Sequence, residues 1–491
     1  MQESDGSYRH ILKYTGIFGG VQGLNILLSL VRTKCVALLL GPSGMGLASL
    51  FNTTVGFVSQ ATNLGLPISA VRRISELYDQ EDRAALEHFV KVIRGWSLLT
   101  ALVGMLVCVA IGPFLSNTTF AWGDHSLHFM LLSPAVGMMA VTGGETAILK
   151  GMRCLGSLAV IQVLAVVAAL VISVPVYYVF GESGIVPVIV MMAFATMVLT
   201  IRRSLRLIPL QLRGVKGILG EGMETVRLGV AFTLAAVIGT ASEMLIRSYL
   251  NVTGDLDVLG LYNAGYMLTI TYAGMVFSAM EADYYPRLSA VQQDIPATNN
   301  TVNRQMEVSV LLISPMLAAL IIGLPLIVPI LFSPQFLPIV GMAQVAALAM
   351  YFKVLTLPVA YITLARGFSL SYLFLETFYF VVFIALIIFG YQHWGLPGTG
   401  IAITLAHVFE YLLVNGYAYK KYGYRISATV YGYALVQVLL GVLAYLLSLT
   451  AEGILYWGAG SLLVLLSLGL SFRVLHRKTH LWQALTKRWR R

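Results

Sequence analysis

The sequence predicts an all-α polytopic membrane protein, with about fourteen transmembrane helices in two pseudo-symmetric six-helix bundles followed by a C-terminal helix pair. Of its 491 residues, 58% are hydrophobic and 11% are charged, and the mean hydropathy of +0.81 exceeds that of soluble globular chains. Apolar runs of roughly 20 residues recur along the chain, which favours helices over the alternating strands of a barrel. Lysine and arginine concentrate in alternate joints between these runs, as a membrane topology requires.

Apolar length sets the predicted spans, and glycine, proline and charged residues mark the joints. The first series of helices is expected at residues 14–40, 46–70, 90–115, 126–149, 156–180 and 184–201. The second series is expected at residues 226–250, 259–283, 306–332, 338–362, 368–390, 396–419, 428–449 and 453–475. No small-residue cleavage site closes the first apolar run, so we interpret it as an uncleaved helix and not as a signal peptide.

The cations predict that both termini are cytoplasmic. Joints after even-numbered helices carry lysine or arginine, whereas odd joints such as "SNTTFAWGDHS" and "NVTGDLD" carry neither. Topology therefore explains the net charge of +10, and no nucleic-acid partner is needed to explain it. The basic tail spaces Leu481, Trp482, Leu485 and Trp489 near the helical period. This spacing is typical of a surface helix on the inner leaflet, with a disordered topogenic tail as the alternative.

Five regions are expected from this order of helices. They are an N-terminal bundle at 1–208, a cytoplasmic linker at 209–225, a C-terminal bundle at 226–420, an additional helix pair at 421–475 and the basic cytoplasmic tail at 476–491.

An internal repeat relates the two bundles. When Gly46 is aligned with Gly260, the segment Arg73-Ile74-Ser75 falls on Arg287-Leu288-Ser289 at the same offset. Both copies begin on the cytoplasmic side, so the repeat is parallel, about an axis along the membrane normal. Such repeats build two bundles that rock around a central cavity.

Cations recur at equivalent depth in the first helix of each repeat. Arg32 and Lys34 precede Gly46, and Arg247 precedes Gly260, by nearly the same number of residues. An intramembrane charge costs roughly 2.5–3.5 kcal/mol to insert, so it normally faces protein or water. We expect these side chains to face a shared wet cavity; the alternative is that they extend to the outer headgroups. Lys353 lies in the middle of its helix, too deep for its side chain to reach the headgroups easily.

Three carboxylates are candidates for ion coupling. Glu243 is spaced correctly for an i,i+4 pair with Arg247, and Glu376 lies in the eleventh helix. Glu145 is the third candidate, although it is one of four acids near cytoplasmic helix ends that we interpret first as interfacial carboxylates. These four are Glu145, Glu281, Asp283 and Glu410.

The predicted chemistry is that of a secondary transporter and not of an enzyme. Clustered arginine and lysine suit a phosphate or carboxylate head, whereas a small inorganic cation would require carboxylates or carbonyls. No phosphate-binding Gly-Lys-Ser/Thr loop occurs, which argues against an ATP-driven pump. The histidines are scattered, and Cys35, Cys108 and Cys154 lack metal-ligand spacing, so we expect no metal, cofactor or catalytic group.

Four segments carry a resemblance to a known family: "LLLGPSGMGLASLF", "AILKGMR", "YYPRLS" and "YFKVLTLPVAYITLARGFSLSYLFLETF". In their order and positions the chain resembles the Wzx-type polysaccharide flippases of the multidrug/oligosaccharidyl-lipid/polysaccharide exporter superfamily. It is most similar to the flippases for O-antigen and enterobacterial common antigen. The resemblance implies two six-helix bundles, with the final helix pair as an addition.

The resemblance also implies a function. It implies export of an undecaprenyl-diphosphate-linked oligosaccharide from the inner to the outer leaflet of a bacterial inner membrane by ion-coupled alternating access. The implied partners are that lipid-linked oligosaccharide and membrane lipids, with a polysaccharide polymerase and a chain-length regulator as further candidates. The family's cationic cavity positions fall on Arg32 or Lys34, Arg247 and Lys353, and its helix-eleven acid falls on Glu376.

Three alternative functions remain open. A multidrug or cation antiporter of the same superfamily should have a carboxylate-rich N-terminal cavity, against which Arg32 and Lys34 argue. A lipid II flippase would also have about fourteen helices and would be essential for growth. A membrane-embedded glycosyltransferase or polymerase should carry a catalytic acid near a large outer loop, and no predicted outer loop is long enough.

Overall fold

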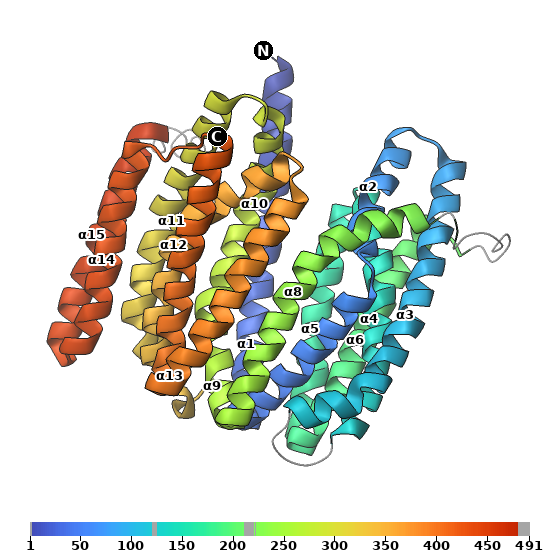
Figure 1. Cartoon of the computed structure of the whole chain (residues 1–491), viewed down its shortest axis with the longest axis horizontal. Coiled ribbons are helices and arrows are strands. Elements are labelled where there is room, and N and C mark those ends of the chain that lie inside the picture. The colour runs from blue at the N-terminus through green and yellow to red at the C-terminus, as the bar shows by residue number, and fades with distance from the viewer. Residues whose placement is uncertain (1, 120–124, 211–219, 221, 480–491) are drawn as a thin grey trace. The chain divides into compact units, whose positions relative to one another are not determined.

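The computed structural model describes residues 2–119, 125–210, 220 and 222–479, and every regular element in these ranges is a helix (Figure 1). Within them, nine helical stretches are long and apolar enough to cross a membrane. The predicted all-α, multi-pass class is therefore confirmed. The total number of spans and the side on which the termini lie stay predictions, and most of the linker and the tail lie outside the described residues.

The chain forms two compact units, Met1–Gly260 with Leu331–Ser333, and Leu261–Ile330 with Pro334–Arg491. The first unit contains α1 (Gln2–Thr62), α2 (Leu66–Asp79), α3 (Arg83–Thr119), α4 (Ser126–Gly151), α5 (Leu155–Phe180), α6 (Ile185–Leu207), α8 (Met223–Thr253) and the first half of α9 (Leu256–Tyr266). The second unit contains the rest of α9, the π-helical turn Met267–Thr271, α10 (Tyr272–Val291), most of α11 (Ile295–Leu331), α12 (Ile339–Ala365), α13 (Ser369–Tyr422), α14 (Ala428–Thr450) and α15 (Gly453–Thr479). The five regions expected from the sequence were drawn from the order of helices and the internal repeat, and their boundaries stay predictions.

Two long helices break where the sequence predicts joints. Gly41 interrupts α1 at φ 65° and precedes Pro42, while Gly395 interrupts α13 at φ 59°, two residues before Pro397. Only glycine adopts this left-handed backbone without strain, and proline cannot continue the preceding helix. Each break therefore separates two of the predicted spans.

The second predicted span, 46–70, is wrong at its end. α1 stops at Thr62, and Leu64 and Gly65 take positive φ angles of 54° and 70°. A separate amphipathic helix, α2, follows. Its buried side chains recur every three or four positions and pack with residues of α3 and α4: Leu66, Ala70, Ile74 and Leu77. Its opposite face is charged, so the segment has too little hydropathy to be predicted as a span.

Small residues bring the helices of the first unit close together. α3, α4 and α6 run side by side (Figure 1). A Cβ atom added to Gly144 of α4 would lie 1.9 Å from Ser97 Oγ of α3, and one added to Gly151 would lie 2.6 Å from Ile74 of α2. Such glycines permit the short interhelical distances that stabilise helix packing in membranes.

The two glycines that define the repeat contact each other's segment within the first unit. A Cβ on Gly46 would lie 2.3 Å from the Leu256 carbonyl oxygen, and one on Gly260 would lie 1.8 Å from the Pro42 carbonyl oxygen. Pro42 and Leu256 occupy the same place in their repeats, four residues before the glycine. The contact is therefore reciprocal, as expected for segments related by a local two-fold axis.

Candidate functional site

A cavity of about 450 Å³ lies inside the first unit, between α1, α4, α5 and α6. Arg32 of α1 and Lys150 of α4 contribute the charged side chains of its lining. Its neutral polar lining residues are Asn52, Thr142, Thr146, Tyr177 and Thr196. No aspartate or glutamate lines this cavity among the described residues.

Arg32 makes contacts only with neutral groups in the part of the chain that the structure describes. Its Nε donates to Ser173 Oγ at 3.3 Å, and its Nη2 lies 3.5 Å from Met192 Sδ. No described carboxylate lies within 4.0 Å of the guanidinium. A partly buried cation without a counter-charge is expensive in a membrane protein, so this position favours an anion.

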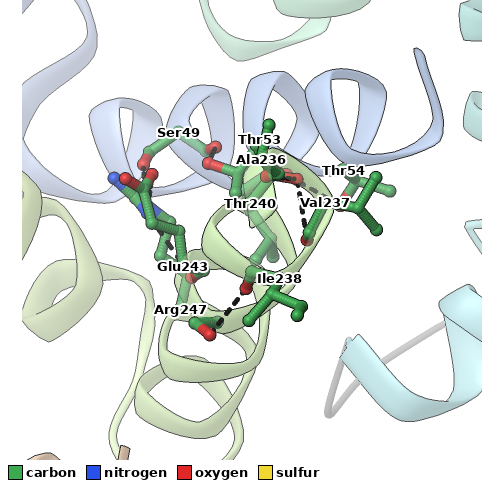
Figure 2. Close-up of polar contacts among 11 residues, drawn as sticks. Ser49, Thr53, Thr54, Ala236, Val237, Ile238, Thr240, Glu243 and Arg247 are labelled. Carbon is green, nitrogen blue, oxygen red and sulfur yellow. Dashed lines mark hydrogen bonds and ion pairs between the residues drawn. The ribbon is translucent and has the colours of Figure 1, made fainter. Parts of the chain in front are cut away.

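Arg247 is held by a carboxylate and a hydroxyl of its own unit (Figure 2). Its Nη1 lies 2.9 Å from Oε2 of Glu243 one turn earlier on α8, and its Nε donates to Ser49 Oγ of α1 at 3.0 Å. The ion pair has the i,i+4 spacing that the sequence predicts. Figure 2 also shows Thr240 bonded to carbonyls of the preceding turn, which satisfies a polar group inside an apolar helix.

Lys34 binds backbone. Its Nζ donates to the carbonyl oxygen of Phe332, which also belongs to the first unit. Lys34 lies two residues beyond Arg32 on α1 and therefore points away from it, and it does not line the cavity.

The second unit contains its own buried charge cluster. Lys353 Nζ of α12 lies 2.8 Å from Oε1 of Glu410 on α13, and it lies 5.9 Å from the centre of the Tyr379 ring. Glu376, on the other half of α13, interacts electrostatically with both Lys353 and Glu410. Lys353 is therefore ion-paired with Glu410, while Glu376 adds a second negative charge that acts on both groups.

Glu410 is the residue of this cluster that the sequence analysis missed. Its place near the end of its helix predicts an interfacial carboxylate. This prediction is wrong: the side chain is 4% exposed, and its Oε2 is buried without a hydrogen-bond partner among the described residues. One signal could have found it: Glu410 is the only charge in the apolar run 396–419. Such an acid normally requires a buried cation or a proton.

Glu145 forms a buried ion pair with Arg94. Nε and Nη2 of Arg94 lie 2.8 Å and 3.3 Å from the two carboxylate oxygens, and the two side chains are 8% and 7% exposed. Nη2 also donates to Ser204 Oγ at 3.2 Å and to the Ile208 carbonyl at 3.1 Å. The geometry joins α3 and α4 to the end of α6. Glu281 and Asp283 have no described side chains.

The arrangement can hold an anionic group in the first unit and an additional proton or small cation in the second. No cluster of three or more metal-ligating side chains occurs in the described ranges. Of the four predicted cations, Arg32, Lys34 and Arg247 lie in the first unit and Lys353 lies in the second.

A family model described as "Polysaccharide biosynthesis protein" matches residues 35–341. No curated protein matches the chain significantly in sequence.

Solved structures show where the fold occurs. The chain is similar to a structure titled "Lipid II flippase MurJ, inward closed conformation", with a TM-score of 0.69 and 14% identity over 94% of this chain and 98% of that one. It is similar to a multidrug resistance MATE family transporter of the MOP superfamily in its inward-facing conformation, with a TM-score of 0.68 and 13% identity over 80% and 94%. A MOP superfamily transporter from Pyrococcus furiosus, described as having a binding pocket of reverse polarity, gives a TM-score of 0.57 and 14% identity over 83% of this chain and 94% of that one. At these identities the similarity shows the fold alone.

Proposed function

Because the chain belongs to the polysaccharide biosynthesis protein family, we propose that it flips an undecaprenyl-diphosphate-linked oligosaccharide from the inner to the outer leaflet of a bacterial inner membrane. Its fold is that of the MOP superfamily transporters. From the family and this fold together we infer a multi-pass membrane transporter and not an enzyme. Within the proposal, transport proceeds by alternating access, and the lipid-linked oligosaccharide is the substrate.

One observation carries the proposal: the cavity of the first unit has two cations and no described carboxylate in its lining. A cation antiporter needs acidic side chains to attract its substrate and its coupling ion. Arginine instead binds phosphate oxygens through paired charge-assisted hydrogen bonds. The Arg32 guanidinium, which contacts only neutral described groups, has donors left for such a ligand.

The substrate explains why a protein is needed. A diphosphate with several sugars cannot cross hydrocarbon unaided, because each unsatisfied polar group costs several kcal/mol. We assign the diphosphate to Arg32 and Lys150. Lys34, Arg247 and Lys353 stay candidates for the same head group, but each already has a partner within its own unit.

The second unit supplies the proposed coupling site. With Lys353 positive and both Glu376 and Glu410 ionised, the cluster carries one excess negative charge, which a proton would neutralise. Glu376 is therefore our first choice among the predicted coupling residues. Glu243 is paired with Arg247 and stays a candidate, whereas Glu145 is held on both oxygens by Arg94 and is better explained as a structural residue.

The alternatives differ in how well they fit this cavity. A multidrug or cation antiporter would fit the fold equally well, but the cavity lacks, among the described residues, the acidic side chains that such an antiporter needs. A lipid II flippase shares the diphosphate chemistry, so the cavity does not separate it from the proposal. Essentiality for growth separates the two functions. A deletion strain that grows normally while losing a surface polysaccharide supports our proposal, and one that cannot make cell wall supports the lipid II alternative.

The test of the substrate site is Arg32→Ala in a complemented deletion strain. We expect at least a tenfold loss of surface polysaccharide, with accumulation of undecaprenyl-linked intermediates, since a hydrogen bond to a charged group is worth about 1.5–3 kcal/mol. Arg32→Lys should retain part of the activity. The matched control is Arg153→Ala, which removes an exposed arginine outside the cavity that pairs with Asp79. Undiminished export by Arg32→Ala would remove this residue from the mechanism.

The coupling site is tested separately by pH. In proteoliposomes, flipping by the wild type should depend on an imposed pH gradient. Glu376→Gln and Glu410→Gln should transport at a rate that no longer responds to the gradient, because an amide cannot exchange a proton. A response that survives both variants would place the coupling elsewhere.

A further inference from the structure

A second basic cavity lies in the first unit, at the end of α6. It has a volume of about 190 Å³ and is lined by Ile161 and Leu164 of α5 together with Leu199, Arg202, Arg203 and Arg206 of α6. The two helices are antiparallel neighbours, joined by the turn Gly181–Gly184, so the start of α5 lies beside the end of α6. This cavity shares no lining residue with the cavity at Arg32.

The three arginines have no counter-charge in the described part of the chain. None of them forms an ion pair or hydrogen bond there, whereas the exposed arginines of α2 and α3 pair with acids of their own helices. Arg202 and Arg206 are four residues apart on one helix face, and like charges at that spacing repel each other. The end of α6 therefore presents three guanidinium groups around one hollow without compensation.

Glu145, the acid that Arg94 links to the end of α6, is already paired. Glu145 accepts from Arg94, which also binds Ser204 and the Ile208 carbonyl on the buried face of α6. The end of α6 thus has two faces: one is fixed to the core through Arg94, and the other carries the three arginines. The positive-inside rule accounts for cations near this end of the helix, but it does not require them to line one cavity with aliphatic side chains.

We propose that this cavity binds the phosphate of an anionic phospholipid. The three guanidinium groups match the phosphate in charge and hydrogen-bonding geometry. Ile161, Leu164 and Leu199 supply an apolar wall for the first part of an acyl chain, and Leu164 is 44% exposed toward the surroundings. In the predicted topology the end of α6 lies at the cytoplasmic leaflet, where anionic lipids attract juxtamembrane arginines.

Lipid binding by the purified full-length chain tests the proposal independently of transport. After delipidation in a neutral detergent, the protein is titrated with phosphatidylglycerol or phosphatidylcholine, and bound lipid is counted by native mass spectrometry. The wild type should prefer phosphatidylglycerol. The triple variant R202Q/R203Q/R206Q should bind it on the order of a hundredfold more weakly, since each surface arginine contributes about a factor of five.

The matched control is R72Q/R73Q/R83Q, which removes the same charge from arginines that are paired with Glu76 and Glu87. It should keep the preference. An equal loss of phosphatidylglycerol binding in both triple variants, or no loss in R202Q/R203Q/R206Q, would overturn the proposal. So would competition by inorganic phosphate as effective as that by the lipid, because the apolar wall would then contribute nothing. Displacement of the phosphatidylglycerol by a polyprenyl diphosphate at far lower concentration would assign the cavity to the transport substrate.

Discussion

Arg94 shows how a single side chain can fix the end of a helix. Its guanidinium meets both oxygens of Glu145 and donates to the Ile208 carbonyl beyond the last turn of α6. The last carbonyls of a helix lack intrahelical partners, so this contact both neutralises a buried acid and caps α6.

Replacing Arg94 by methionine should destabilise the protein strongly. Glu145 would remain buried without its partner, and breaking a buried ion pair costs about 3–5 kcal/mol. We expect a clearly lower melting temperature in detergent for Arg94→Met, and a smaller decrease for the double variant Arg94→Met/Glu145→Met, which leaves no unpaired charge. A double variant at least as unstable as the single one would contradict this interpretation.

Glu76 on the charged face of α2 should titrate below its ordinary range. Hydrogen bonds from Arg72 and then from Arg73 lower the pKa of its carboxyl group. A lowered folded-state pKa means that the contribution to stability is present above the ordinary glutamate pKa and is lost as pH falls through the lowered value. Titration of labelled glutamate by NMR should show the shift, and Arg72→Gln should reduce it. The same pKa in Arg72→Gln and the wild type would argue against the pair.

At this scale, sequence reasoning succeeded where partners are local. The pair Glu243–Arg247 follows from the helical period, because side chains four residues apart share a face. The pair Lys353–Glu410 joins residues 57 positions apart. The period of one helix does not tell which neighbouring helix it packs against. Glu410 was therefore interpreted only from its position near the cytoplasmic end of its helix, as a carboxylate at the membrane–water interface.

At the scale of elements, the reciprocal contact between Gly46 and Gly260 makes a sharp prediction. Gly46→Ala would place a Cβ 2.3 Å from the Leu256 carbonyl oxygen, so the backbone must move. Overpacking of this kind typically costs about 1–3 kcal/mol. Gly56→Ala, on the same helix with nothing within 4 Å of the added Cβ, should leave the melting temperature unchanged or raise it. Equal melting temperatures for the two variants would show that the contact is not tight.

The helices themselves were largely predictable, because hydropathy reports burial in lipid. The polar extensions were not. α3 begins at Arg83 and not near residue 90, and α11 begins at Ile295 and not near residue 306. These turns, like α2, are amphipathic segments that hydropathy alone does not identify as helical.

At the scale of the whole molecule, the repeat predicted two related halves from the order of helices alone. The structure groups α8 with the first compact unit, where Arg247 binds Ser49 of α1. Such grouping depends on which side chains meet across helices. A repeat in sequence fixes the order of the elements but does not specify those contacts.

The size of the cavity at Arg32 has a consequence for cargo tolerance. Its volume of about 450 Å³ falls in the range of sites for a single drug-sized molecule, roughly 300–1,000 Å³. A cavity of this size is too small for a glycan of several sugars. Under the proposed function, the cavity would enclose the diphosphate and the first sugar, and the distal sugars would make no contact with its lining. Glycans that differ at their far end should then flip at similar rates in proteoliposomes, while loss of one phosphate should slow flipping sharply. Such a carrier could serve polysaccharides whose outer residues diversify while their anchor stays constant.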